Sequence, residues 1–455
     1  MSVCRKLLPE LLIAVGLAFG TAQAGRAQTA DPLSIDEAIS LARVHHPQAA
    51  AAEAQQEQAR AQLQQAKARR LPTLSASEDV TYSNDPVFAF GSKLRQARFS
   101  SSDFDLGALN DPAALSNFSA SATATWTAFN GGATRRQVDS AHTSLEAAKL
   151  NARYSQEQIA SEITRLYYRV LLAQEEVRVA DSALKRTREI AADIQDRVHS
   201  GLSLESDGLR TRLALRNTED DLASAQSNVV LAKQDLFDAI GTPQADRPLV
   251  PPDVHATIAT PEPVTAIHSP DARFDLQALR LQQQAAKQTL ASIRATAWPQ
   301  VSTYGHVEND AEHFVTNGSG NWTLGAKVEL HIFDGGARRA QEDEAEAQEH
   351  LLAARERETA LAARATVDSL QQQIGDLHRR FDTADAAISV QQEVLQTARD
   401  RYAAGLDSIS DVLSGESDLS SAEFTRARIF YQICIARTEL ALASGSPLVS
   451  KAGQP

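Results

Sequence analysis

The sequence predicts a mainly α-helical fold with a small β part, made of two similar halves of one chain. Residues 129–136 (FNGGATRR) return as residues 333–339 (FDGGARR), 204 residues later. Two other landmarks return at the same spacing: Gly201-Leu202 as Gly405-Leu406, and Gly241-Thr242-Pro243 as Gly445-Ser446-Pro447. Three matches in one register indicate an internal duplication. An aromatic content of only 5% favours long helices with small seam residues over a bulky globular core.

The duplication divides the chain into five predicted segments. These are a signal peptide at 1–24, a first structural repeat at 25–243, an inter-repeat linker at 244–270, a second structural repeat at 271–447 and a disordered tail at 448–455. A basic start, a short apolar run and Ala22-Gln23-Ala24 indicate the signal peptide. The upstream parts of the halves align at a spacing of 227 residues, so one loop of the first half is 23 residues longer.

Each repeat is predicted to contain two β-strands. Polar and apolar residues alternate at residues 73–83, 119–128, 298–309 and 321–333. A period of two is typical of strands with unlike faces. After the signal no apolar run approaches the ~20 residues of a membrane helix, whereas strands of this length with Trp near their ends fit an outer-membrane barrel. Four strands cannot close a barrel, so either the protein oligomerises or these strands lie outside a membrane.

A helix of unusual length is predicted after each Gly-Gly pair. Small and apolar residues recur at alternating spacings of three and four over 138–198 and 370–402, which is the coiled-coil heptad. About 65 helical residues extend ~100 Å, the width of a periplasm rather than of a bilayer. Each helix is predicted to end at a glycine, Gly201 or Gly405. The predicted return helices are 209–240 and 412–444.

The sequence argues against several other classes of protein. A formal net charge of −13 disfavours nucleic-acid binding. Cys434 is the only cysteine after the signal, and adjacent His45 and His46 point to different faces of a helix, so no metal site is expected. Phosphate-binding loops, nucleophile elbows and zinc-protease motifs are missing from the sequence. We therefore expect no cofactor and no enzymatic activity.

The repeated motifs resemble the TolC-like outer-membrane efflux and secretion channels over essentially the whole mature chain. The resemblance is carried by the aromatic-x-Gly-Gly-x-x-Arg junctions that begin at Phe129 and Phe333, and by the two Gly-Leu-x-x-x-x-Asp tips. It implies a homotrimer in which four strands per subunit form a twelve-stranded outer-membrane β-barrel, continued by a helical barrel across the periplasm. The implied partners are outer-membrane lipid, a periplasmic adaptor (membrane fusion protein) and an inner-membrane pump.

The resemblance also implies roles for residues at the helical tips. Asp207 and Tyr402 match a pair that holds the closed tip together, and Asp411 matches a carboxylate that rings the periplasmic entrance. The chain departs from the pattern at Asp407, where the family has an arginine, and at Ser414, where it has a second ring carboxylate. The residues alone leave another interpretation open, in which the aspartates cap the return helices and the tyrosine is a seam residue.

The glycines mark two further candidate sites. The predicted adaptor-docking tips are Gly201, Leu202, Gly405 and Leu406, and the predicted strand–helix junctions are Gly131, Gly132, Gly335 and Gly336. Together these features predict a passive exit duct of a tripartite efflux or type I secretion system, for drugs, metal ions or polypeptides. The alternative is a periplasmic coiled-coil adaptor or scaffold, which would share the signal and the hairpins but would need no lipid-facing strands.

Overall fold

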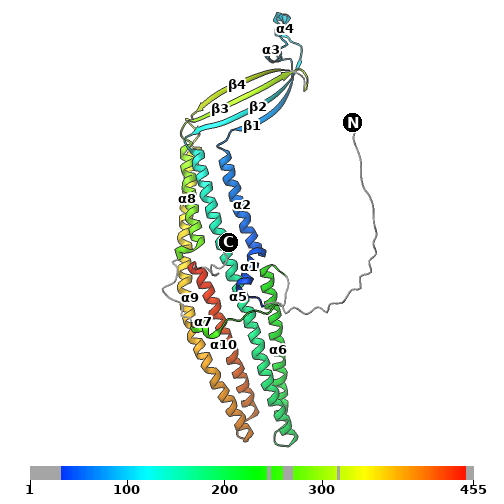
Figure 1. The fold of residues 1–455 in the computed structure, drawn as a ribbon, viewed down its shortest axis with the longest axis vertical. Coiled ribbons are helices and arrows are strands. Elements are labelled where there is room, and N and C mark those ends of the chain that lie inside the picture. Colours follow the sequence, from blue (N-terminus) through cyan, green and yellow to red (C-terminus); the bar gives the residue numbers. More distant parts are fainter. Residues whose placement is uncertain (1–31, 243–246, 260–269, 315–317, 447–455) are drawn as a thin grey trace, which may run out of the picture.

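The computed structural model describes residues 32–242, 247–259, 270–314 and 318–446 (Figure 1). The predicted signal peptide, residues 244–246 and 260–269 of the predicted linker, and the predicted tail lie outside these residues. The elements of the first repeat are α1 (Ile35–His45), α2 (Pro47–Ala68), β1 (Thr73–Ser83), α3 (Pro86–Arg95), η1 (Ser101–Phe104), α4 (Leu106–Asn110), β2 (Leu115–Asn130), α5 (Ala133–His199) and α6 (Glu205–Ile240). Those that follow are α7 (Val254–Ala259), η3 (Pro270–Ala272), α8 (Phe274–Ala295), β3 (Gln300–Ala311), β4 (Ser319–Glu329), α9 (Ala337–Ala403) and α10 (Ile409–Ser444).

The four strands form one antiparallel sheet in the order β1-β2-β3-β4. In its register Trp126 lies opposite Thr303 and Trp322 lies opposite Val307. Because side chains alternate between faces, one face carries mostly apolar residues, and the other carries Ser, Thr and charged residues. The apolar face is exposed: Trp322 is 78% accessible. The sheet therefore has the unlike faces that the sequence predicted.

The strand boundaries differ from the prediction at several places. β2 extends beyond the predicted 119–128 at both ends, β3 ends at Ala311 rather than at 309, and β4 begins at Ser319 rather than at 321. β3 begins at Gln300 rather than at Trp298, because the Trp298 N–H still donates to Ala295 O in the turn that ends α8. β4 ends at Glu329 rather than at Phe333, because its partner β3 begins at the residue opposite. The alternation beyond Glu329 is present in the sequence but has no neighbouring strand in the same chain.

The long helices and their return helices form two matched hairpins that end far from the sheet (Figure 1). α5 and α9 each contain 67 residues, and α6 and α10 each contain 36. The predicted seams are largely buried, for example at Ile159, Ile163 and Phe381. This burial confirms the heptads as the packing faces of the hairpins. Among the described residues, no helix is both long and apolar enough to cross a membrane.

The middle of the molecule holds the main apolar core, where both hairpins meet the first helix. Tyr167 of α5 is fully buried there, and its hydroxyl donates to Leu33 O at 2.7 Å and accepts from Val250 N at 2.7 Å. Leu33 also forms a parallel bridge with Leu249. These contacts fasten the segment before α1 and the segment after α6 to the long helix.

Between this core and the sheet, α2, α5, α8 and α9 form a wall of neighbouring helices (Figure 1). The longer loop of the first half contains α3, η1 and α4, and it lies at the far end of the sheet from this wall (Figure 1). The sheet and the hairpin tips are therefore at opposite ends of the molecule, separated by the length of the helices.

Candidate functional site

The two hairpin tips are tight turns built around glycines. Gly201 and Gly405 have φ values of +70° and +74°, which L-residues rarely adopt. The leucine after each glycine is unusually exposed, 76% for Leu202 and 67% for Leu406. The structure thus places the four predicted docking residues at the two tips, with two apolar side chains facing solvent.

Tyr402 and Asp207 lie together where the two hairpins meet. The Tyr402 hydroxyl donates to Asp207 Oδ2 at 3.3 Å, and it lies 3.0 Å from Ser203 Oγ. The Arg197 guanidinium lies 5.9 Å from the centroid of the tyrosine ring. Burial raises the pKa of the Tyr402 hydroxyl, the Ser203 bond lowers it, and the Asp207 carboxylate raises it again. These contacts join the end of α9 to the turn after α5 and to the first turn of α6.

Asp411 has a different environment although it occupies the equivalent position in the second repeat. Its Oδ2 accepts from Ser408 N at 2.9 Å and from Ser408 Oγ at 2.7 Å, which forms a capping box at the start of α10. These hydrogen bonds lower the pKa of the Asp411 carboxyl. The side chain is exposed and its charge is retained. Asp411 is therefore a helix-capping residue with an exposed carboxylate.

Asp407, which departs from the family pattern, forms an ion pair within its own turn. Arg401 Nε and Nη2 donate to its two carboxylate oxygens at 2.8 and 2.9 Å. This bidentate bond raises the pKa of the Arg401 guanidinium. The pair spans the turn from the last residues of α9 to the start of α10, so it stabilises the tip of one hairpin rather than linking two hairpins.

A buried ion-pair cluster that the sequence did not predict links α5 to α10. Glu416 is only 4% exposed and accepts from Arg186 Nε at 2.8 and 3.0 Å. Arg186 also donates to Glu423 at 3.2 Å, and Arg399 Nη2 lies 4.0 Å from Glu416. Burial raises the pKa of the Glu416 carboxyl, whereas Arg186 lowers it. The family pattern has a second ring carboxylate where this chain has Ser414. Glu416 cannot take that role, because its side chain points into the contact with Arg186.

The sequence does hold a signal for this cluster. Glu416 lies on α10 between Val412 and Leu419, which are buried seam residues, so a charge there requires a partner across the seam. Ser414 is exposed instead, on the same side of the helix as Asp411. The exposed face of α10 thus carries one carboxylate, that of Asp411, in the first turn of the helix.

The four junction glycines share a conformation but differ in their surroundings. Gly131, Gly132, Gly335 and Gly336 all have positive φ, between +66° and +87°. A Cβ on Gly131 would lie 2.4 Å from Ala295 O and 2.7 Å from Trp298 Cβ, whereas one on Gly335 or Gly336 would meet nothing within 4 Å. The backbone requires glycine at both junctions, and close packing requires it only at Gly131.

The adjacent histidines of the first repeat do not converge on a third ligand. His46 Nδ1 accepts from Gln48 N at 3.1 Å and caps α2, while His45 is exposed. Throughout the described part of the chain, no group of three or more His, Cys, Asp or Glu side chains is arranged to hold a metal ion. The residues around the tips provide hydrogen bonds and charge.

Comparison with known proteins identifies relatives of the whole chain. It is 24% identical over 408 residues to the probable outer membrane lipoprotein SilC of Salmonella typhimurium, covering 86% of this chain and 80% of that protein. It is also 24% identical over 407 residues to the pyoverdine export outer membrane protein OpmQ of Pseudomonas putida, covering 87% and 82%. These relatives are outer-membrane proteins, which decides against the adaptor alternative.

Solved structures show the same fold. The outer membrane protein VceC from Vibrio cholerae superposes with a TM-score of 0.76 at 19% identity, covering 91% of this chain and 97% of that one. CusC superposes with a TM-score of 0.79 at 19% identity, covering 90% and 92%. The sequence profile of the family described as outer membrane efflux protein matches residues 38–242 and 271–446. The chain therefore belongs to the outer membrane efflux protein family and is an efflux channel of the outer membrane.

Proposed function

We propose that three copies of the chain form one passive duct that crosses the outer membrane and the periplasm, and that this duct is the exit of a tripartite efflux or type I secretion assembly. The observation that carries the proposal is the sheet. β1 and β4 are edge strands in the described chain, and one face is apolar. In lipid every backbone N–H and C=O needs a partner, so β4 of one copy pairs with β1 of the next.

The number of copies follows from closing the barrel. Four strands cannot close a barrel, and eight leave an interior that side chains fill, whereas three copies supply twelve strands, which enclose a lumen with cyclic symmetry. The polar face of Ser, Thr and charged residues then lines the lumen, and the apolar face contacts lipid. The helices continue the wall over ~100 Å, given 67 residues at 1.5 Å each. The duct binds and releases cargo without a catalytic step.

The tips are the proposed dock and gate. Exposed Leu202 and Leu406 offer apolar anchors to a periplasmic adaptor, which connects the duct to an inner-membrane pump. The hydrogen bond between Tyr402 and Asp207 holds the second hairpin against the first in the closed tip. Relatives are named for export of pyoverdine and of solvents. We infer that the pump selects the cargo and that the polar lumen accepts whatever it delivers.

Oligomeric mass and conductance test the proposal together. The full mature protein, purified in detergent, should have three times the protein mass of one subunit by light scattering, and it should open single channels in planar bilayers. Cys434 is buried, so cysteines placed on the exposed edges of β1 and β4 would crosslink without interference from it. A protein that stays monomeric and does not conduct would refute the channel assembly.

A further inference from the structure

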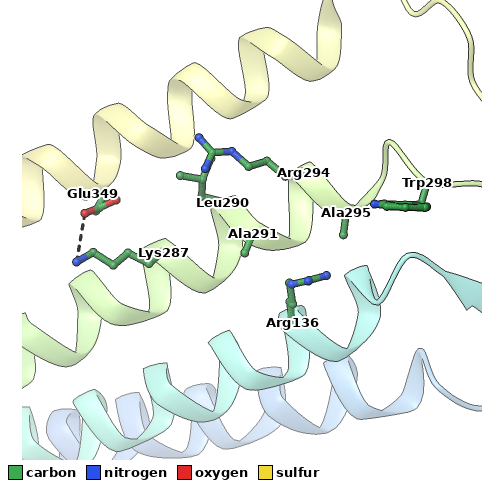
Figure 2. A pocket seen from close by; sticks show the side chains of 8 residues that line it. All are labelled: Arg136, Lys287, Leu290, Ala291, Arg294, Ala295, Trp298 and Glu349. Carbon is green, nitrogen blue, oxygen red and sulfur yellow. Dashed lines mark ion pairs between the residues drawn. The ribbon is translucent and has the colours of Figure 1, made fainter.

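An open hollow lies just below the sheet, on the wall formed by α5, α8 and α9. It holds about 440 Å³, and Figure 2 shows cationic side chains of α5 and α8 around it. Arg136, Lys287 and Arg294 provide the charge, Ala291 and Ala295 form a small-residue floor, and Trp298 lies at the end nearest the sheet. Nothing in the gate or the docking tips uses these residues.

The cations of the hollow are only loosely neutralised. Lys287 Nζ lies 3.5 Å from Glu349 Oε1, and Arg294 lies 3.6 and 3.7 Å from Glu342 and Glu346. Close N⁺–H···O⁻ hydrogen bonds are ~2.7–2.9 Å long. Arg136 Nη1 donates to Gly131 O at 3.1 Å, and a guanidinium carries five N–H donors. Donors therefore remain for a bound anion.

The hollow lies on the opposite face of α8 from a second hollow. The second hollow is lined by residues from all four helices, among them Gln65, Gln137 and Gln341, and most of that lining is polar, as in a lumen. On α8 the second hollow uses Thr289 and Ile293, whereas the first uses Lys287 and Ala291. These pairs lie on opposite faces of the helix. The cationic hollow thus faces away from the lumen.

The depth of the hollow matches the headgroup layer of the outer membrane. Trp126, Phe129 and Trp298 are exposed at this end of the sheet, as aromatic residues are at a membrane–water interface. The Arg136 guanidinium reaches back to Gly131 O, directly after β2, whereas Arg294 lies six residues before β3, ~9 Å at 1.5 Å per residue. The polar layer of a bilayer is ~5–8 Å thick on each side. The Arg136 guanidinium therefore lies at phosphate depth, and Arg294 lies at the periplasmic edge of that layer.

We propose that this hollow binds the phosphate of a phospholipid headgroup from the periplasm-facing leaflet. Arg136 and Arg294 donate to the phosphodiester oxygens, Lys287 adds charge, and Trp298 contacts the glycerol and upper acyl chain. The small floor at Ala291 and Ala295 makes the room that the headgroup occupies. Each subunit carries a complete site, since all of its residues come from one chain. The site fixes how deeply the junction between strands and helices sits in the membrane.

Native mass spectrometry of delipidated protein tests the site with short-chain phosphatidylglycerol as the probe. Lys287→Gln with Arg294→Gln should weaken binding about tenfold, because charge-assisted bonds to phosphate are lost. Ala291→Leu should weaken it comparably by filling the floor without changing any charge. Arg355→Gln with Arg357→Gln is the matched control, because it removes two exposed positive charges from α9 outside the hollow, and it should leave binding unchanged.

Each remaining outcome decides the proposal. Equal binding of short-chain diacylglycerol, which lacks the phosphate, would overturn it. Retention of inorganic phosphate without phosphatidylglycerol would show an anion site that does not take lipid, and would also overturn it. Binding that falls equally in the control pair would mean nonspecific attraction to the surface. Loss of binding in both hollow variants, with oligomer mass and conductance unchanged, would support the site independently of the channel assembly.

Discussion

The two repeats share a backbone and differ in what their side chains do. Their long helices have the same length, their return helices have the same length, and their tips and junctions use glycines of the same conformation. At the tips, however, Asp207 accepts from Tyr402 of the other hairpin, while Asp411 caps its own helix. The two repeats therefore share the glycines and the helix lengths that determine the backbone, and they differ in the polar contacts at their tips.

The junctions show the same contrast. Gly131 packs on the end of α8 within its own chain, whereas Gly335 faces open space. By the register of the duplication, the counterpart of Trp298 is Leu71, which is 65% exposed. In a closed ring the second junction of one copy meets the first repeat of the next. Gly335 thus faces the place where we expect a neighbouring subunit.

The largest expected effect separates these junctions. Gly131→Val combines strain at positive φ, about 1–2 kcal/mol, with a clash against Ala295 O inside the chain, and it should strongly reduce the yield of folded protein. Gly335→Val carries the strain alone within the subunit, and it should give folded subunits that form fewer trimers. Circular dichroism and light scattering would measure the two losses separately. Equal loss of folded protein in both variants would remove the distinction between the junctions.

The second prediction compares Glu416 with Arg212, its counterpart in the first repeat. Glu416→Leu leaves Arg186 without its main partner in a buried site, and breaking such pairs costs about 3 kcal/mol or more. Arg212 is exposed, so Arg212→Leu should change stability by less than about 0.5 kcal/mol. Thermal unfolding in detergent would compare them. If Glu416→Leu were as stable as the wild type, the cluster would not link the hairpins energetically.

Most of the helices and strands could be predicted from the sequence, because the spacing of apolar residues follows which face of each element is buried. The boundaries of β1 agree with the alternation, whereas β4 stops before residues 330–333, which continue the alternation but have no partner strand. A period shows which face a residue takes and does not show whether another strand lies beside it. That boundary was set by pairing with β3, which local sequence does not encode.

The tip was less predictable for a related reason. Heptads show that α5 and α10 have buried seams, but they do not show which seams face each other. Arg186 and Glu416 are 230 residues apart, and their contact follows only from the packing of two hairpins. The pairing of Asp207 with Tyr402 was proposed from a family resemblance rather than from spacing. The structure brings these two side chains together, and their role in gating stays a prediction.

The third prediction separates the charge of Asp411 from its capping bond. Asp411→Asn keeps an oxygen acceptor for the helix start and removes the charge, so it should weaken block by multivalent cations with little change in melting temperature. Asp411→Ala should weaken block and also lower the melting temperature. Because hydrogen bonds hold the Asp411 pKa below its ordinary value of 3.8, the ionised cap is complete above about pH 3.8 and is lost as pH falls through the folded pKa.

Single-channel recording with a melting scan at two pH values would measure both effects. The difference in melting temperature between Asp411→Ala and the wild type should shrink in acid, where the wild-type carboxyl is also protonated. Asp207→Asn gives the comparison for melting temperature from the first repeat. Its effect on melting should be small, since Asp207 makes no capping bond among the described contacts. Unchanged cation block in both Asp411 variants would restrict this residue to a structural role.

The smallest expected effect concerns the bond between Tyr402 and Asp207, which at 3.3 Å is long and partly exposed. Tyr402→Phe and Asp207→Ala should each raise conductance modestly, because each removes one contact that holds α9 against the turn of the first hairpin. The double variant should conduct no more than the larger single change, since one bond can be lost only once. Ser203→Ala tests whether the hydroxyl at 3.0 Å shares that function. Additive increases in the double variant would mean that Tyr402 and Asp207 act separately. Asp207 would then resemble Asp411 in having no functional bond to the other hairpin.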